Sequence, residues 1–224
     1  MSFRYERDMV GPAKAWLESR GLLTKTEFLT PWGICDLVGC SLNSRNASKR
    51  MKLRQTSTMG SLTRVKLFSL MPDSQPVRME ELNAKVGSFI SNGKVSAEMR
   101  ELVVRRFVEI TPHGAFLKKD GWIPLQKKIV ALELKLARIG EAFDQALAHL
   151  EFADESYVGY PAYIAKRVVA SGKRQAFVSA GIGVLAVMPS QCGILLPARA
   201  SSSPNPVVQT YLVERFWRTY LRDK

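Results

Sequence analysis

The chain has 224 residues, of which 46% are hydrophobic, so it is long enough to bury a core and too apolar to be disordered as a whole. Its formal net charge of +13 favours a polyanionic partner over an acidic one, without separating nucleic acid from an anionic membrane. Residues 1–8 are too polar for a secretory signal, and the longest apolar stretch, at 178–188, is too short to span a bilayer. We therefore expect a cytoplasmic protein with no membrane partner.

Most of the positive charge lies in the middle of the chain. Residues 1–43 are neutral, whereas residues 44–128 carry a net charge of +10. No acidic residue occurs between Asp36 and Asp73. We interpret residues 44–58 as a basic linker, which is either a solvated, mobile connection or a flexible segment that contacts phosphates.

The first 43 residues predict a helix followed by a hairpin. Apolar side chains recur at helical spacing within residues 4–20, and a basic last turn precedes Gly21, a typical C-cap. Residues 22–29 and 33–40 are rich in β-forming residues, and the short turn between them favours an antiparallel hairpin. The second strand contains Asp36.

The middle of the chain predicts three helices and a second hairpin. The expected helices cover residues 62–70, 79–86 and 96–108, and the expected strands cover 107–110 and 115–117. Ser96 is the expected N-cap of the third helix. Three helices followed by a hairpin are typical of a winged helix, a helix-turn-helix variant. We interpret residues 59–125 as an inserted, winged-helix-like α+β domain that binds DNA, with residues 96–106 as its recognition helix.

The last part of the chain predicts alternating strands and helices. Strands are expected at residues 127–137, 156–160 and 183–188, and helices at 139–150, 163–171 and 207–221. This order favours a mixed α/β sheet flanked by helices. Residues 1–43 and 126–224 would then form one discontinuous core around the insert. Gly181 and Gly183 are interpreted as a turn into a buried strand, not as a phosphate-binding loop.

Two charged residues stand in the apolar strand expected at 127–137. Period-two alternation places Glu133 and Lys135 together on one face, opposite a row of apolar side chains. Burying a carboxylate and an ammonium there costs several kcal/mol unless they pair or bind a ligand. One explanation is an ordinary ion pair on a surface-facing edge strand.

A second explanation involves Asp36, which is likewise a single acid inside an apolar strand. Two carboxylates from neighbouring strands supply the hard oxygen ligands that Mg²⁺ or Mn²⁺ requires. Such an ion polarises a phosphodiester and lowers the pKa of an attacking water, while a nearby lysine orients that water or balances the developing charge. Asp36, Glu133 and Lys135 together therefore indicate metal-assisted hydrolysis.

At these residues the chain resembles the PD-(D/E)XK nuclease superfamily, which includes many restriction endonucleases and Holliday-junction resolvases. Asp36 matches the family aspartate, and Glu133-Leu134-Lys135 matches the E-x-K motif. Gln145 falls where several branches carry a helical glutamine. Glu6 matches an acidic position of the resolvase-like branch, and Glu27 competes with it for that role because it lies on the preceding strand.

The resemblance covers residues 1–43 and about 127–190, and it departs from the family pattern at two points. Cys35 stands where the family has proline, and the segment between Asp36 and Glu133 is long, which the inserted domain explains. The resemblance implies a restriction-endonuclease-like fold and a metal-dependent DNA endonuclease. It also implies a metal site of Asp36, Glu133 and Glu6, filled by Mg²⁺ or Mn²⁺.

DNA is the expected partner, bound through the basic middle of the chain. The residues expected to contact it are Arg45, Lys49, Arg50, Lys52, Arg54, Arg64, Lys94, Arg100, Arg105, Arg106, Lys118 and Lys119. A homodimer is compatible with this reading. One alternative is a catalytically inactive DNA-binding or regulatory protein on the same scaffold. Another is a nuclease subunit of a larger DNA-processing or transposition complex, with RNA as a further substrate class.

The remaining candidate ligands receive structural interpretations. Cys35, Cys40 and Cys192 form an odd set without a C-x-x-C pair, so we expect reduced core thiols and no structural zinc site. His149 is interpreted as a group on the helix surface or just outside the site. Neither histidine lies near a nucleophile in an arrangement typical of serine or cysteine hydrolases.

Overall fold

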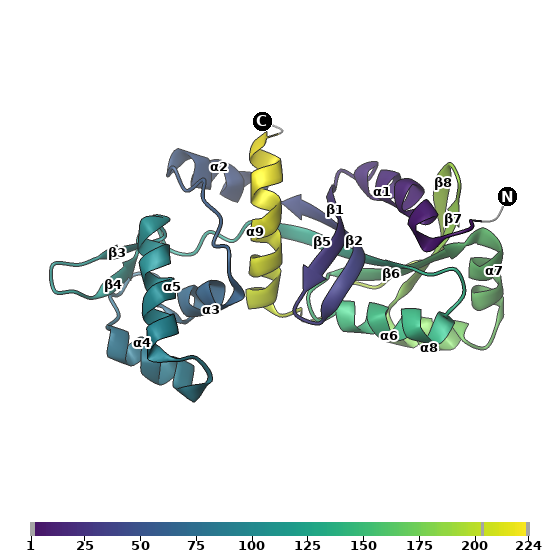
Figure 1. The fold of residues 1–224 in the computed structure, drawn as a ribbon. Coiled ribbons are helices and arrows are strands. Elements are labelled where there is room, and N and C mark those ends of the chain that lie inside the picture. Colours follow the sequence, from purple (N-terminus) through teal and green to yellow (C-terminus); the bar gives the residue numbers. More distant parts are fainter. Residues whose placement is uncertain (1–2, 203, 223–224) are drawn as a thin grey trace. The chain divides into compact units, whose positions relative to one another are not determined.

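A computed structural model describes residues 3–202 and 204–222, which fall into two compact units (Figure 1). The sheet unit comprises the residues up to Ser41 together with Lys127–Gln209. The helical unit comprises Leu42–Gln126 and the residues from Thr210 onward. Among the described residues, no helix is both long and apolar enough to cross a membrane.

The sheet unit is built on one mixed six-stranded sheet with the order β1-β2-β5-β6-β7-β8. The strands are β1 (Leu23–Thr30), β2 (Gly33–Leu42), β5 (Gln126–Leu134), β6 (Glu155–Pro161), β7 (Gly183–Met188) and β8 (Gln191–Leu196). β1 and β2 form the expected antiparallel hairpin, β5, β6 and β7 run parallel, and β8 returns antiparallel to β7. The expectation of a mixed sheet flanked by helices is confirmed at this level.

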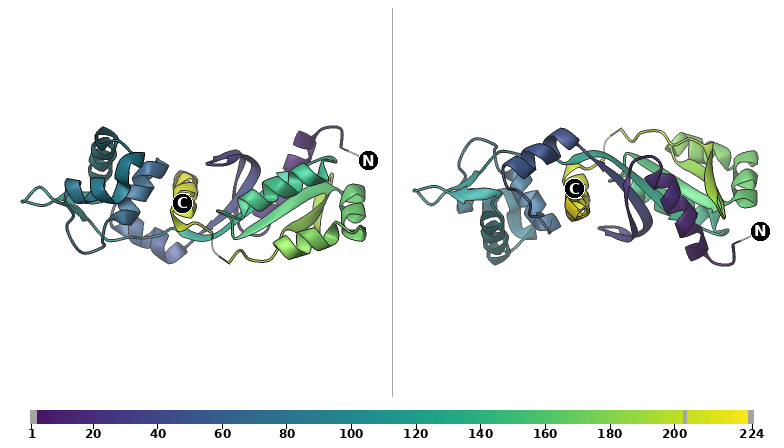
Figure 2. Two further views of the ribbon diagram at one scale, coloured as in Figure 1. Left: turned by 90° about the horizontal axis from the view of Figure 1, so that it is seen from below. Right: turned by 90° about the horizontal axis from the view of Figure 1, so that it is seen from above.

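Helices cover the two faces of this sheet and bury separate apolar cores (Figures 1 and 2). The 3₁₀ helix η1 (Glu6–Met9) and α1 (Val10–Glu18) pack on Val130, Leu132 and Leu134 of β5. The other face carries α6 (Ile139–His149), α7 (Ala162–Ala170) and α8 (Arg174–Ala180). The predicted alternation along β5 is thus confirmed, and Glu133 belongs to the row opposite the α1 core.

Two elements of the sheet unit were not predicted from the sequence. α8 precedes β7 and ends at Gly181, whose φ of +75° is the left-handed conformation that glycine adopts without strain. The residues after Gly181 enter the buried strand β7, as expected. β8 was missed because its sequence shows no clear alternation, and pairing with β7 defines it.

The helical unit contains the three expected helices and the expected hairpin. Its elements are α2 (Ser44–Lys52), α3 (Leu62–Leu70), α4 (Met79–Val86), the 3₁₀ turn η2 (Gly87–Phe89), α5 (Asn92–Val104), β3 (Val108–Ile110) and β4 (Phe116–Lys118). Two expectations were wrong in detail. α5 begins four residues early, because the hydroxyl of Ser91, not that of Ser96, caps it by accepting the Lys94 N–H at 3.3 Å. Residues 44–52 of the expected linker form α2.

A buried ion pair joins α2 to the closing helix α9 (Pro206–Arg222) within the helical unit. Arg50 is 1% exposed and donates to both carboxylate oxygens of Glu214 and to the carbonyl of Ser57. Its guanidinium carbon lies 5.1 Å from the ring centres of both Phe107 and Trp217. This side chain is therefore part of the core, because Glu214 neutralises its charge and its two terminal nitrogens donate to groups of the fold.

For three of the residues expected to contact DNA, the expectation is wrong because their side chains are buried in ion pairs. Arg50, Arg64 and Lys118 are all buried, and each is paired with a carboxylate of the helical unit. Arg105 is partly buried, and its guanidinium donates hydrogen bonds to the carboxylate of Glu101 and to the carbonyl of Thr58. The exposed cations of the expected set are Arg45, Lys49, Lys52, Arg54, Lys94, Arg100, Arg106 and Lys119.

Glu214→Ala is expected to destabilise the protein by about 3–5 kcal/mol, because it leaves the Arg50 charge buried without a partner. The loss should appear as a lower urea midpoint in circular dichroism. Arg45→Ala, which removes an exposed cation of the same helix as Arg50, should change stability by less than about 0.5 kcal/mol. Equal effects of the two substitutions would contradict the buried pair.

Candidate active site

The predicted site residues converge on the end of β5. Asp36 of β2 accepts the backbone N–H of Leu134 at 2.8 Å, and Glu6 of η1 accepts the backbone N–H of Leu136 at 3.1 Å. Both amides flank Lys135 in the chain. Two carboxylates from distant segments are thereby fixed beside the strand end that carries Glu133 and Lys135.

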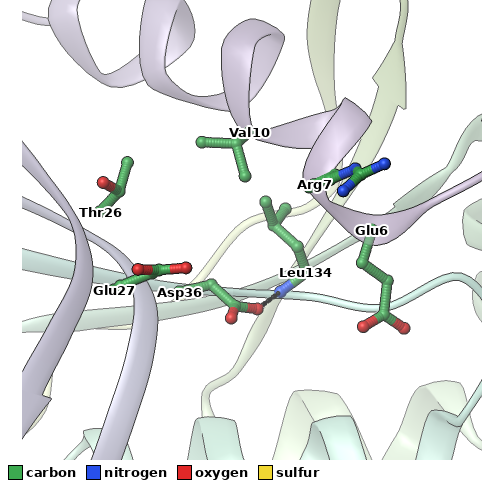
Figure 3. A pocket seen from close by; sticks show the side chains of 7 residues that line it. All are labelled: Glu6, Arg7, Val10, Thr26, Glu27, Asp36 and Leu134. Carbon is green, nitrogen blue, oxygen red and sulfur yellow. Dashed lines mark hydrogen bonds between the residues drawn. The ribbon is translucent and has the colours of Figure 1, made fainter.

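An open pocket of about 370 Å³ lies over this strand end. Its lining comprises Glu6, Arg7, Val10, Thr26, Glu27, Asp36 and Leu134. In the view of Figure 3, the carboxylates of Glu27 and Glu6 lie to either side of Asp36, and the dashed line marks the bond from Leu134 to Asp36. Three carboxylates therefore line one pocket: Glu6 and Asp36 of the predicted metal ligands and the competing Glu27, whereas Glu133 lies outside the lining.

Glu27 adopts an unusual backbone conformation within β1. Its φ of +46° lies in the left-handed region, which residues with a side chain seldom occupy in a strand. Such strain costs roughly 1–3 kcal/mol and tends to occur at functional sites. Three non-glycine residues of the described chain have a positive φ, namely Glu27, Arg54 and Arg106, and Glu27 is the one that lines the pocket.

Glu133 and Lys135 form a buried ion pair beside the pocket. Nζ of Lys135 lies 2.7 Å from Oε1 of Glu133, and the two residues are 8% and 1% exposed. β5 lies between β2 and β6 in the sheet. The simpler explanation, an ion pair on a surface-facing edge strand, is therefore wrong.

Burial raises the pKa of two carboxyl groups at the site. It raises the pKa of Glu133 to about 7, and the negative charge of Asp36 adds to the shift, while the hydrogen bond from Lys135 opposes it. Burial also raises the pKa of Asp36, with Glu6 contributing, against the Leu134 amide and Lys135. Burial thus disfavours the ionised form of both carboxyl groups, and a bound cation would favour it.

One face of α6 completes the surroundings of this pair. Glu141, Gln145 and His149 follow one another at four-residue spacing, which aligns them along the helix. Glu141 lies 3.6 Å from the Lys135 ammonium, and Nε2 of His149 lies 4.0 Å from Oε2 of Glu133. Oε1 of Gln145 is buried and has no hydrogen-bond partner in the described part of the chain.

Some residues of this environment were missed by sequence reasoning. The expectation that His149 lies at the helix surface is wrong, because it is buried; its place beside Glu133 agrees with the other expectation, a group just outside the site. Its spacing from Gln145 and Glu141 is the signal that could have found it. Cys35, treated as a core thiol, places its Sγ 3.8 Å from Nδ1 of His149.

The donor set around the pocket fits a hard divalent cation. Glu6, Glu27 and Asp36 line the pocket with carboxylate oxygens, whereas Glu133 lies outside the lining; oxygen ligands suit an octahedral Mg²⁺ or Mn²⁺ ion, with water in the remaining positions. The observation that supports this fit is the gathering of three carboxylates in one pocket, where burial, and to a lesser degree the charge of Glu6, raises the pKa of Asp36.

No protein-family model matches the chain, and no curated protein matches it either. One similar solved structure is a protein of unknown function from Silicibacter pomeroyi, with a TM-score of 0.46 and 10% sequence identity. The alignment covers all of this chain and 90% of that one. A likeness at this level carries no functional argument.

The free energy of unfolding is expected to fall by on the order of 2 kcal/mol between pH 4.5 and 7 through Glu133 alone. The unfolded carboxyl ionises near its ordinary pKa of 4.5, whereas folding raises that pKa to about 7. The stabilisation is therefore complete below the lower value and lost as the pH rises to the higher one. Urea titrations in chelator, comparing wild type with Glu133→Gln, measure it.

The comparison isolates Glu133 because His149 is present in both proteins. Burial lowers the pKa of His149 to about 4, so its contribution changes with pH in the opposite sense. A difference between the two proteins that stays constant with pH would contradict the shift assigned to Glu133.

Proposed function

We propose that the sheet unit is a metal-dependent nuclease of the PD-(D/E)XK type that hydrolyses DNA phosphodiester bonds. The observation that carries this proposal is the convergence of Asp36 and Glu6 on the backbone amides around Lys135. It brings acids from two distant segments to the E-x-K strand, at a pocket open enough to admit a phosphate.

Each residue has a defined part in the proposed chemistry. A Mg²⁺ or Mn²⁺ ion held by Asp36, Glu133 and Glu6 would polarise the phosphodiester and lower the pKa of a bound water. Glu6 is preferred to Glu27 as the additional ligand, because it is anchored on the Leu136 amide, just beyond the strand that carries Glu133, while Glu27 is exposed. Glu27 then anchors a water at the mouth of the pocket.

Lys135 orients the attacking water and balances the negative charge that develops on the phosphate. Glu133 and Glu141 hold its ammonium in place from two sides, at 2.7 and 3.6 Å. Gln145 has an unsatisfied carbonyl oxygen near this group of residues, so it supplies an acceptor for a water or for the lysine.

We further propose that the helical unit docks DNA as a winged helix. α3, α4 and α5 are followed by the β3-β4 hairpin. An isolated bridge also pairs Val77, in the segment between α3 and α4, with Phe116 of β4. In this arrangement α5 is the recognition helix and presents Arg100, while Lys119 follows β4. Phosphate contacts from exposed cations give affinity that falls with salt.

Asp36→Asn and Lys135→Met are each expected to lower the rate of DNA cleavage with Mg²⁺ or Mn²⁺ by at least about 100-fold. The first removes a metal ligand and the second the group that orients the water. Cleavage of plasmid, linear and branched DNA, followed on gels, measures the effect. RNA of matched length tests the alternative substrate class.

The sheet provides a matched control in a second Lys-Glu pair. Nζ of Lys128 lies 2.6 Å from Oε1 of Glu155, and both residues are outside the lining of the pocket. Lys128→Met should therefore cleave at the wild-type rate. Equal cleavage by wild type and Asp36→Asn would indicate contamination and reject the enzyme. Salt-sensitive DNA binding without cleavage would favour the inactive DNA-binding alternative.

Arg100→Ala and Lys119→Ala are each expected to weaken DNA binding and to reduce the slope of log K against log salt by about one. Each substitution removes one cation that can neutralise a phosphate. Fluorescence anisotropy across a series of salt concentrations measures both quantities. Lys14→Ala, on α1 of the sheet unit, should leave the slope unchanged; an unchanged slope in all three variants would refute the assignment of the interface.

A further inference from the structure

A second cluster of ligating groups lies on the α6 side of Glu133, outside the lining of the pocket. It comprises Cys35 of β2, Glu133 of β5 and His149 of α6, all of them buried. One ligand atom from each lies within 4.8 Å of the other two. Sγ of Cys35 is 3.8 Å from Nδ1 of His149, and Nε2 of His149 is 4.0 Å from Oε2 of Glu133.

The cluster contains an unsatisfied buried oxygen. Oε2 of Glu133 has no hydrogen-bond partner among the described residues, although Glu133 is 1% exposed. Leaving a buried carboxylate oxygen unpaired costs more than about 1–3 kcal/mol, so a ligand at this position would be stabilising. Lys135 satisfies only the other oxygen of the same carboxylate.

The chemistry of the cluster differs from that of the pocket. A thiolate and an imidazole are ligands for Zn²⁺ and similar thiophilic cations, whereas Mg²⁺ selects oxygen. His149 is buried beside Glu133, and a neutral imidazole offers one ring nitrogen as a ligand. The set of one sulfur, one nitrogen and one oxygen resembles a zinc site with three protein ligands and an open fourth position.

We propose that Cys35, His149 and Glu133 form a site for a thiophilic divalent cation of the Zn²⁺ class, distinct from the carboxylate pocket. Donors around a tetrahedral zinc ion are roughly 3.3–3.6 Å apart. One ring nitrogen of His149, Sγ of Cys35 and a carboxylate oxygen of Glu133 lie within 4.8 Å of one another, so they draw together by about 1.5 Å or less on binding. The Cys35 thiol gives its proton to solvent as the sulfur-metal bond forms, and water occupies the fourth position.

Aromatic rings cover the cluster and offer a reporter of ion binding. The ring of Phe152 lies 5.6 Å from that of His149, and Trp32 stacks on Phe152 at 6.1 Å. Trp32 is half exposed in the turn between β1 and β2. Because Phe152 contacts both rings, a shift of His149 on binding an ion should change the fluorescence of Trp32.

Glu133 is a proposed ligand both of the Mg²⁺ ion and of the zinc-class ion. Binding of a zinc-class ion would therefore affect the proposed nuclease. A zinc-class ion that engages Glu133 on the His149 side withdraws it from Asp36 and from the pocket. The ion then inhibits cleavage in competition with Mg²⁺. This consequence rests on the proposed nuclease function, whereas the site itself does not.

The test titrates Co²⁺ into the metal-free full-length chain and follows absorbance. One equivalent should produce the near-ultraviolet charge-transfer band of a cobalt-thiolate bond, with a change in tryptophan fluorescence. Cys35→Ser should abolish the band, and His149→Ala should weaken Co²⁺ binding by at least about tenfold. Mg²⁺ in excess should not displace the thiolate-bound ion. Absence of the band in wild type would overturn the proposal.

The other two thiols supply matched controls that leave Cys35 intact. The double variant Cys40→Ser, Cys192→Ser retains Cys35 as its single cysteine, so it should give the wild-type band even if Cys35→Ser fails to fold. Loss of the band in this double variant would assign the ion to another thiol and reject the site. A chain that binds Co²⁺ through Cys35 without cleaving DNA would reject the nuclease proposal alone.

Discussion

The central constraint in this protein is a carboxylate that is buried in an inner strand of the sheet and has a hydrogen-bond partner among the described residues for only one of its two oxygens. Glu133 is almost fully enclosed, and Lys135 satisfies one of its two oxygens. Asp36 brings a second negative charge close enough to raise the pKa of Glu133 further. A fold selected for stability alone would place apolar side chains at these positions, because a buried ionic group seldom stabilises a protein more than a well-packed apolar one. The uncompensated charge is therefore the feature that a function must explain.

The carboxylate of Glu133 lies close to two kinds of potential metal ligand, which belong to the adjacent residues Cys35 and Asp36. Asp36 lines the open pocket with other acids, while Cys35 lies beside His149 of α6. Hard oxygen donors and soft sulfur and nitrogen donors select different cations. The arrangement thus combines a proposed catalytic ion and a proposed thiophilic ion that compete for Glu133, and the competition follows from geometry and not from a separate regulatory element.

Some of the basic side chains of the helical unit are buried in ion pairs, and the others are exposed. Arg50, Arg64 and Lys118 are buried against carboxylates, so they stabilise the helical unit and contribute little to its surface field. The cations that remain exposed along α2, α5 and the end of β4 carry the attraction for a polyanion. Composition overstated the number of residues able to reach a phosphate, because a count of charges does not separate those that pair inside the fold.

The sequence by itself determined the elements whose apolar period is strong and the residue types of the site. The alternation along β5 placed Glu133 and Lys135 correctly, and the lone acid of β2 identified Asp36. The tertiary structure decided which groups meet: that β5 is an inner strand, that Glu6 reaches the Leu136 amide, and that Cys35, His149 and Glu133 adjoin. It also decided that Arg50 is enclosed by α9. The contacts of Glu6 with Leu136, of Cys35 with His149 and of Arg50 with Glu214 join residues more than 100 positions apart. Local periodicity fixes which face a side chain occupies without fixing the segment packed against that face.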